Sequence, residues 1–169
     1  MTASIDCIRF ILKQGLSFRG HDESEDSINR GNFLELLQFL AKHNEEVSKV
    51  VLKNAPENLK LTSHQIQCDI VNSIATETTN AIIRDIGDHI FSILVDEARD
   101  ISIKEQMAVA LRFVDERGFL MERFLGIVHV SDTTALSLKA AIEYLLSKHG
   151  YSLSSIRGQG YDGVSNMRG

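Results

Sequence analysis

The sequence predicts an α/β protein in which a helical region, residues 1–88, precedes a mixed β-sheet region, residues 89–169. Two observations predict this fold class. In the first half, apolar residues recur every three or four positions, as they do on one face of a helix. In the second half, short β-prone apolar runs are separated by turn residues, and one helical stretch precedes the last run.

Composition is that of a globular protein, with 43% hydrophobic and 24% charged residues in a chain of 169. The net charge of −5 argues against tight DNA binding by this segment alone, since DNA binders present a basic face. Apolar runs fall far short of the roughly 20 residues of a membrane helix. The first residues have no secretory cleavage pattern. We therefore expect no membrane association.

Two helices are predicted before Pro56. Ile5, Ile8 and Leu12 share one helical face. A second apolar stripe is expected to end near Pro56, and it consists of Phe33, Leu36, Leu37 and Leu40.

A third, long amphipathic helix is predicted over residues 62–87. Thr62 and Gln65 have the spacing of a capping box at its start, and Gly87 is a suitable stop. Its stripe consists of Ile66, Ile70, Ile74, Thr78, Ala81 and Ile82. We expect this face to pack on the rest of the protein.

Three strands are predicted next, near residues 90–96, 106–114 and 119–130. The continuous run HIFSILVD predicts a central strand that is buried on both faces. The second strand alternates, and its predicted buried face consists of Met107, Val109, Leu111 and Phe113. The letters DERG predict a turn that joins the second and third strands into a hairpin.

A helix and a fourth strand complete the pattern. Asp132 or Thr133 is expected to cap the helix, and Gly150 to end it. Its apolar stripe consists of Leu138, Ile142 and Leu145. Because strand–helix–strand connections are right-handed crossovers, the strand near residues 155–161 should lie parallel to the strand at 90–96.

Two acids follow predicted strands directly, namely Asp96 and Asp162. If the strands are neighbours, the two carboxylates lie about 5 Å apart and repel each other unless a cation neutralises them. Hard oxygen ligands suit Mg²⁺ or Mn²⁺, and a pair of such ions can catalyse phosphodiester chemistry. Gly160 and Gly163 would let backbone or a phosphate approach closely. The alternative, that these acids form turns or cap helices, stays open.

Other candidate ligands are assigned no site. Glu97 and Asp100 are expected in a solvated turn or cap, and the acidic stretch HDESED on a solvated surface. Cys7 and Cys68 are predicted to be free thiols. No two of the six histidines form a metal-binding pair, and we assign them no role.

Three stretches carry a resemblance to a known family: FSILVDEARDISIKEQMAVALRFVD, ERFLGIVHVSDTTALSLKAAIEYLL and RGQGYDGVSNMRG. They resemble hAT-superfamily transposases and their host-domesticated relatives, above all plant proteins with a TTF-type or MYM-type zinc finger and a hAT dimerisation region. The first half resembles the domain of unknown function in the same group, so the similarity covers essentially all 169 residues.

The resemblance implies a ribonuclease H-like core with a DDE acid triad. Asp96 matches the first acid and Asp162 the second, and both would hold Mg²⁺ or Mn²⁺ for DNA cleavage and strand transfer. Ala98 stands where the family often has a hydroxyl residue. Family members act on DNA in the nucleus and form homodimers through a region with no counterpart in these 169 residues.

The family's third acid, a glutamate, and its zinc finger also have no counterpart here. We therefore expect a truncated, incomplete core that is inactive alone. The competing expectation is a domesticated, non-catalytic module that binds other proteins, and the fate of the third acid would distinguish the two.

Overall fold

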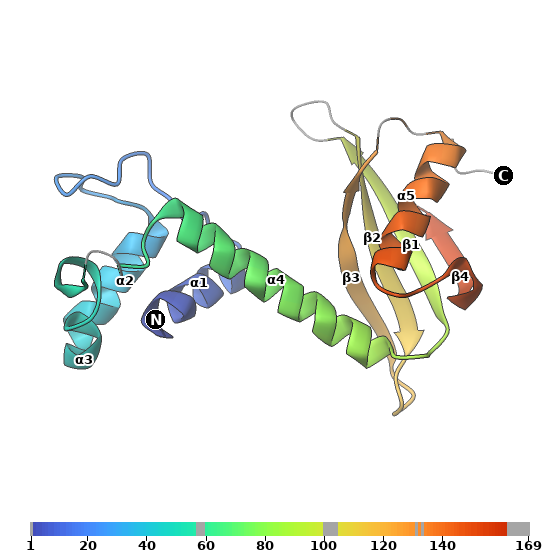
Figure 1. Cartoon of the computed structure of the whole chain (residues 1–169), viewed down its shortest axis with the longest axis horizontal. Coiled ribbons are helices and arrows are strands. Elements are labelled where there is room, and N and C mark those ends of the chain that lie inside the picture. Colours follow the sequence, from blue (N-terminus) through green and yellow to red (C-terminus); the bar gives the residue numbers. More distant parts are fainter. Residues whose placement is uncertain (1, 57–59, 100–104, 131, 133, 162–169) are drawn as a thin grey trace. The chain divides into compact units, whose positions relative to one another are not determined.

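The computed structural model describes residues 2–56, 60–99, 105–130, 132 and 134–161. The chain divides into two compact units, Met1–Glu77 and Thr78–Gly169. The first consists of helices and the second of a mixed sheet with helical cover (Figure 1). The α/β class predicted from the sequence is confirmed. The division falls within helix α4, whereas the sequence placed the boundary between residues 88 and 89.

Helix α1, Thr2–Gln14, and helix α2, Asn32–His43, form the centre of the helical unit. Its buried core consists of Cys7, Ile8, Ile11, Phe33, Leu37 and Val51. The face predicted for α1 is partly wrong, because Leu12 is exposed and Ile11 is buried in its place. The buried side of α1 is centred on the adjacent pair Cys7 and Ile8, which turns Leu12 outward.

The helical stripe of α2 ends earlier than Pro56. Asn44 has an extended backbone, and its side chain accepts hydrogen bonds from the backbone N–H groups of Glu46 and Val47. This cap starts the short helix α3, Glu45–Ser48, which precedes a 3₁₀ turn, Leu52–Asn54. An asparagine that satisfies amide groups of the next turn favours a new helix start over continuation.

The cap of helix α4, His64–Ile86, lies one residue after the predicted one. The Ser63 hydroxyl accepts from the Ile66 amide, so Ser63 rather than Thr62 caps the helix. Gln65 bonds Asp69 instead of closing a capping box. Gly87, with φ +51°, ends the helix as predicted. Thr78 and Ala81 of the predicted stripe are exposed, while Ile82 packs against the sheet core.

The sheet contains four described strands: β1, Phe91–Arg99; β2, Glu105–Val114; β3, Leu120–His129; and β4, Ile156–Tyr161. Their order is β3-β2-β1-β4. β2 pairs antiparallel with both β1 and β3, and β4 pairs parallel with β1. The predicted hairpin and parallel crossover are therefore confirmed.

One face of this sheet carries the core. Met107, Val109, Leu111 and Phe113 of β2 are buried, as predicted from their alternation. Helix α5, Ala135–Lys148, covers this face with Leu138, Ile142, Leu145 and Leu146 (Figure 1). The side chain of Thr134 caps α5, whereas Asp132 accepts from the Thr134 amide. The predicted cap, Asp132 or Thr133, is thus replaced by the next hydroxyl residue; Thr133 itself lies outside the described residues.

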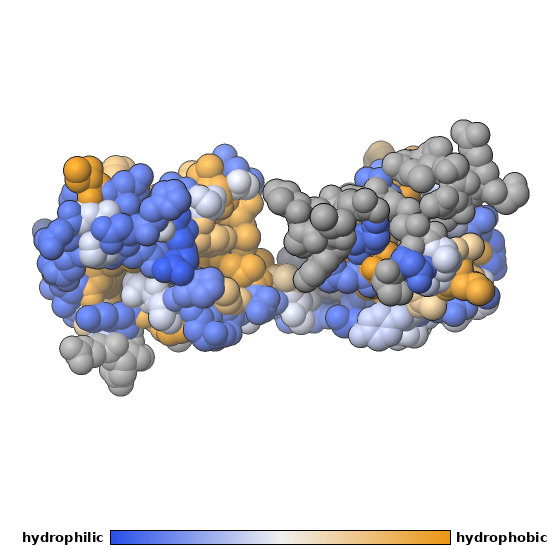
Figure 2. Space-filling view, turned by 90° about the horizontal axis from the view of Figure 1, so that it is seen from above, coloured by the Kyte–Doolittle hydropathy of each residue, from blue (hydrophilic) through white to orange (hydrophobic). Residues whose placement is uncertain are grey.

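The opposite side of the sheet, here called the open face, bears Leu94, Asp96, Ala108, Ala110, Phe124 and Ile127. Phe124 is 56% exposed and Ile127 is 57% exposed. The prediction that the first strand is buried on both faces is therefore wrong: Phe91, Ile93 and Val95 are buried, but Leu94 is only half-buried. Hydrophobic patches also interrupt the hydrophilic surface shown in Figure 2.

Candidate functional site

Asp96 lies on β1 at the side of the sheet where β1 and β4 end together. Val95 and Tyr161 form the last described pair of the parallel ladder, so Asp96 comes one residue after that pair. Its side chain is exposed, and on β2 its register partner is Ala108. Asp162, the second predicted acid, lies outside the described residues, as do Asp100 and Gly163.

A hollow of about 290 Å³ adjoins Asp96. Phe124, Ala110, Leu94 and Gly160 form one row of register partners across four strands, and Ala108 lies next to Asp96 in the following row. The small side chains of Ala108 and Ala110, between larger neighbours, leave the space. The small residues thus keep the surroundings of the Asp96 carboxylate open.

Gly160 has a different role from the one predicted. A Cβ atom at Gly160 would lie 2.9 Å from Cδ2 of Leu94, so the Leu94 side chain occupies the space above this glycine. The Ser92 side chain likewise occupies the space above Gly158, because its Oγ would lie 2.8 Å from a Cβ atom added there. The glycines of β4 therefore admit side chains of the neighbouring strand.

Within the described part of the chain, no hydrogen bond or ion pair engages the Asp96 carboxylate. Arg112, on the same side of the sheet, is bound by Glu122, with 2.7 Å between Nε and Oε1. No group of three His, Cys, Asp or Glu side chains gathers among the described residues. An accessible carboxylate beside a hollow fits a hard cation such as Mg²⁺ or Mn²⁺, and the described residues supply this one oxygen ligand.

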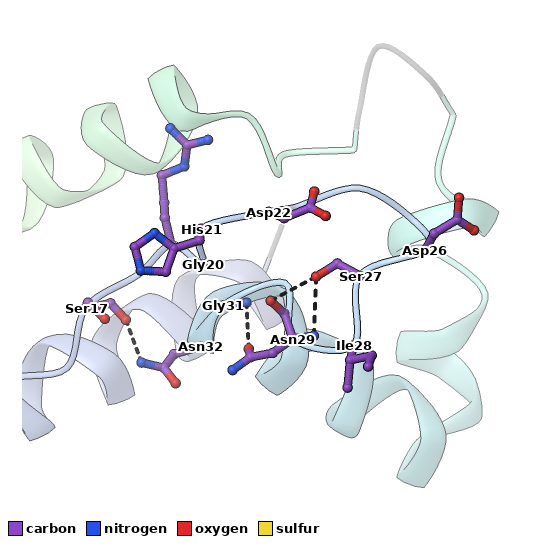
Figure 3. A pocket seen from close by; sticks show the side chains of 11 residues that line it. Ser17, Gly20, His21, Asp22, Asp26, Ser27, Ile28, Asn29, Gly31 and Asn32 are labelled. Carbon is purple, nitrogen blue, oxygen red and sulfur yellow. Dashed lines mark hydrogen bonds between the residues drawn. The ribbon is translucent and has the colours of Figure 1, made fainter.

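Another hollow, of about 710 Å³, lies in the helical unit, at the loop that joins α1 to α2 (Figure 3). The loop is tied by its own hydrogen bonds: Asn32 Nδ2 donates to the Ser17 carbonyl, and Asn29 Oδ1 accepts from the Gly31 amide. Its polar atoms thus stabilise the loop itself.

Three acids of this loop each form a different ion pair or hydrogen bond. Glu23 pairs with Arg19, and Glu25 pairs with Lys53 at 2.9 Å. The hydrogen bond from Lys53 lowers the pKa of the Glu25 carboxyl from its ordinary value. Asp22 accepts from the Ser24 amide, which likewise lowers its pKa. These acids do not converge on one point.

Both cysteines are free thiols, as predicted. Burial raises the pKa of Cys7 to about 11. Cys68 is half-buried, and its sulfur lies 3.7 Å from Nε2 of His64. This pair was not predicted from the sequence, although the i, i+4 spacing of His64 and Cys68 indicates that the two side chains share one helix face.

A helical region followed by a mixed sheet of order β3-β2-β1-β4 makes this an α/β protein. The chain belongs to the family described as "ZMYM1/FAM200, RNase-like domain" (DUF4371), whose model matches residues 1–169.

Two curated relatives are both named "52 kDa repressor of the inhibitor of the protein kinase". The human protein is 32% identical over 158 residues, and the mouse protein is 30% identical over 158 residues. Each alignment covers 88% of this chain but 20% of the relative, so the chain spans about a fifth of their length. No solved structure matches the chain.

The family match and the relatives support a hAT-like, transposase-derived domain, in agreement with the motifs. The plant, TTF-type and zinc-finger features of the resemblance stay predictions. None of the helices in the described ranges is long and apolar enough to cross a membrane.

Proposed function

We propose that this chain is the helical region and the first part of the catalytic core of a hAT-like DDE transposase or a domesticated derivative. Asp96 and Asp162 are the first two acids of its metal site. The parent activity is metal-dependent DNA cleavage and strand transfer in the nucleus. The observation that carries the proposal is the parallel pairing of β1 with β4, whose last described pair, Val95 and Tyr161, directly precedes both acids in the sequence.

The chemistry follows from charge. Neighbouring strands lie about 4.8 Å apart, so carboxylates one residue past a register pair repel each other in the absence of a cation. Asp96 is exposed beside an open hollow, which leaves room for a hydrated ion and a phosphate group. Mg²⁺ or Mn²⁺ held there supplies activation of an attacking oxygen and stabilisation of the leaving one.

Manganese binding to the purified chain tests the assignment. We expect Mn²⁺, followed through the relaxation of water protons, to bind weakly to the native chain, and Asp96→Asn and Asp162→Asn each to abolish most of that binding. Asp88→Asn is the matched control, because Asp88 is an exposed acid outside the sheet. Equal Mn²⁺ binding by all four proteins would contradict a site at Asp96 and Asp162.

A second candidate is a non-catalytic module that binds other proteins. Two features favour it: the curated relatives are named as repressors, and the open face exposes Phe124 and Ile127. If the chain is such a module, Mn²⁺ does not bind at Asp96. In that case, substitutions on the open face abolish the binding of a partner protein, and substitutions at Asp96 do not.

A further inference from the structure

His64 and Cys68 face each other on the first two turns of α4. The sulfur of Cys68 lies 3.7 Å from Nε2 and 3.9 Å from Nδ1 of His64. Residues four apart on a helix share one face, which explains the approach. His64 is exposed and Cys68 half-buried, so an ion in solvent can reach both.

The separation matches that of two ligands on one tetrahedral ion. Zinc binds sulfur at about 2.3 Å and imidazole nitrogen at about 2.0–2.1 Å, which at a tetrahedral angle places the two donor atoms about 3.6 Å apart. The observed 3.7 Å to Nε2 shows that the two side chains are within reach of this separation, but the sulfur lies almost equally far from Nδ1, so the ring must turn to present one nitrogen to an ion. A turn of the exposed imidazole ring about its Cβ–Cγ bond aims one nitrogen at the shared ion.

Neither donor is committed elsewhere. Among the contacts of the described residues, His64 and Cys68 have side-chain hydrogen-bond partners only in each other. No third His, Cys, Asp or Glu in the described ranges completes a cluster with them. The described residues therefore supply two ligands to an ion held here.

We propose that His64 and Cys68 form a bidentate site for a borderline divalent metal ion such as Zn²⁺, with water in the two remaining tetrahedral positions. Thiolate and imidazole are the ligands that Zn²⁺ favours. On binding, the Cys68 thiol loses its proton to solvent and forms an S–Zn bond. Binding therefore weakens as the pH falls, and it stabilises the start of α4 by joining its first two turns.

Cadmium tests the site directly, because a Cd²⁺–thiolate bond gives an ultraviolet charge-transfer band. We expect Cd²⁺ titration of the whole chain to give one such band that saturates at one ion per chain, and Zn²⁺ to displace it. Cys7 does not contribute, since it is 1% exposed and its thiol has a pKa of about 11.

Three variants identify the ligands. Cys68→Ser should abolish the band, and His64→Ala should weaken Cd²⁺ affinity at least about tenfold, since the loss even of an outer-shell partner of a ligand costs about 10–100-fold. His43→Ala is the matched control, since this exposed imidazole bonds the Phe39 carbonyl instead, and it should leave the band and affinity unchanged. All three substitutions are at surface-accessible positions, and circular dichroism checks the helical content.

Three results would overturn the proposal. The first is the absence of a band in the native chain. The second is unchanged affinity in His64→Ala, which would mean that the thiol binds alone. The third is one ion per two chains, which would mean that a second copy rather than water completes the tetrahedron.

Discussion

Val95 of β1 and Tyr161 of β4 are partners in a parallel ladder, although the β2–β3 hairpin and helix α5 separate them in the sequence. Both strands run in the same direction, and an acid follows each partner directly in the sequence. The crossover through α5 therefore determines whether Asp96 and Asp162 are neighbours. Their proximity is a question of geometry that can be tested apart from any metal chemistry.

Engineered cysteines test this geometry. In a Cys68→Ser background, the pair Asp96→Cys and Asp162→Cys should form a disulfide under mild oxidation, because neighbouring positions on adjacent strands have the Cα separation of about 4.4–6.8 Å that a disulfide needs. Mass spectrometry of the unreduced tryptic digest identifies the linked peptides. The matched pair Asp88→Cys and Asp162→Cys should stay reduced. Failure of the first pair to link in a folded protein would place the two acids apart.

The two faces of the sheet should differ in their sensitivity to truncation. Leu111 is fully buried, so Leu111→Ala should lower the free energy of unfolding by about 2–5 kcal/mol. Phe124 is 56% exposed, so Phe124→Ala should cost about 1 kcal/mol or less despite the larger deletion. Urea denaturation measures both. Equal losses would show that the open face is covered in solution.

The alternating strand was predictable and the continuous one was not. In β2, large apolar residues alternate with smaller or polar ones, so the sequence pattern itself identifies the inward face of Met107, Val109 and Leu111. In β1 the apolar Leu94 lies between Ser92 and Asp96 on the open face, which makes the run from Ile93 to Val95 continuous, and a continuous run does not say which face is covered. Leu94 is half-buried because α5 packs on the other face, a tertiary fact that the sequence of β1 does not contain.

The caps of α4 and α5 were predicted to within one or two residues, whereas the start of α3 was not predicted. Thr62 and Ser63 are adjacent, Asp132 and Thr134 are two residues apart, and all four have a similar preference for capping, so the sequence identifies the turn but not the capping residue. At the candidate site, the alternation and crossover rules predicted the strand that bears Asp96 and its parallel neighbour. Placing Asp162 depends on residues outside the described ranges, and its role stays a prediction.

The loop of Figure 3 depends on a close approach between two glycines. Gly31 has φ +95°, and a Cβ atom there would lie 2.1 Å from the backbone nitrogen of Gly20. Gly15 also has a positive φ, +64°, but no atom lies within 4 Å of an added Cβ. Gly15→Ala should therefore cost about 1 kcal/mol from backbone strain alone. Gly31→Ala should cost about 1–3 kcal/mol more, because backbone must move. Urea denaturation followed by helical circular dichroism compares the two, and equal losses would contradict the close approach.

The turn between β2 and β3 makes the stability of the sheet depend on pH. Asp115 accepts hydrogen bonds from the amides of Phe119, at 2.8 Å, and Arg117, at 3.0 Å. The bond from Phe119 is the main cause that lowers the pKa of Asp115 below its ordinary value of 3.8. Because the native pKa is the lower one, the carboxylate stabilises the fold above pH 3.8, and this contribution is lost as the pH falls through the native pKa.

Asp115→Asn keeps an oxygen acceptor but removes the titration. We expect the native protein to be more stable than this variant at neutral pH, and the difference in unfolding free energy to shrink steadily as the pH falls below 3.8. Urea denaturation at a series of pH values measures the difference. Glu116→Gln is the control, since it removes one exposed charge from the same turn without breaking a hydrogen bond of the described residues. A difference for Asp115→Asn that stays constant with pH, or that Glu116→Gln reproduces, would show that the turn's hydrogen bonds do not depend on the Asp115 charge.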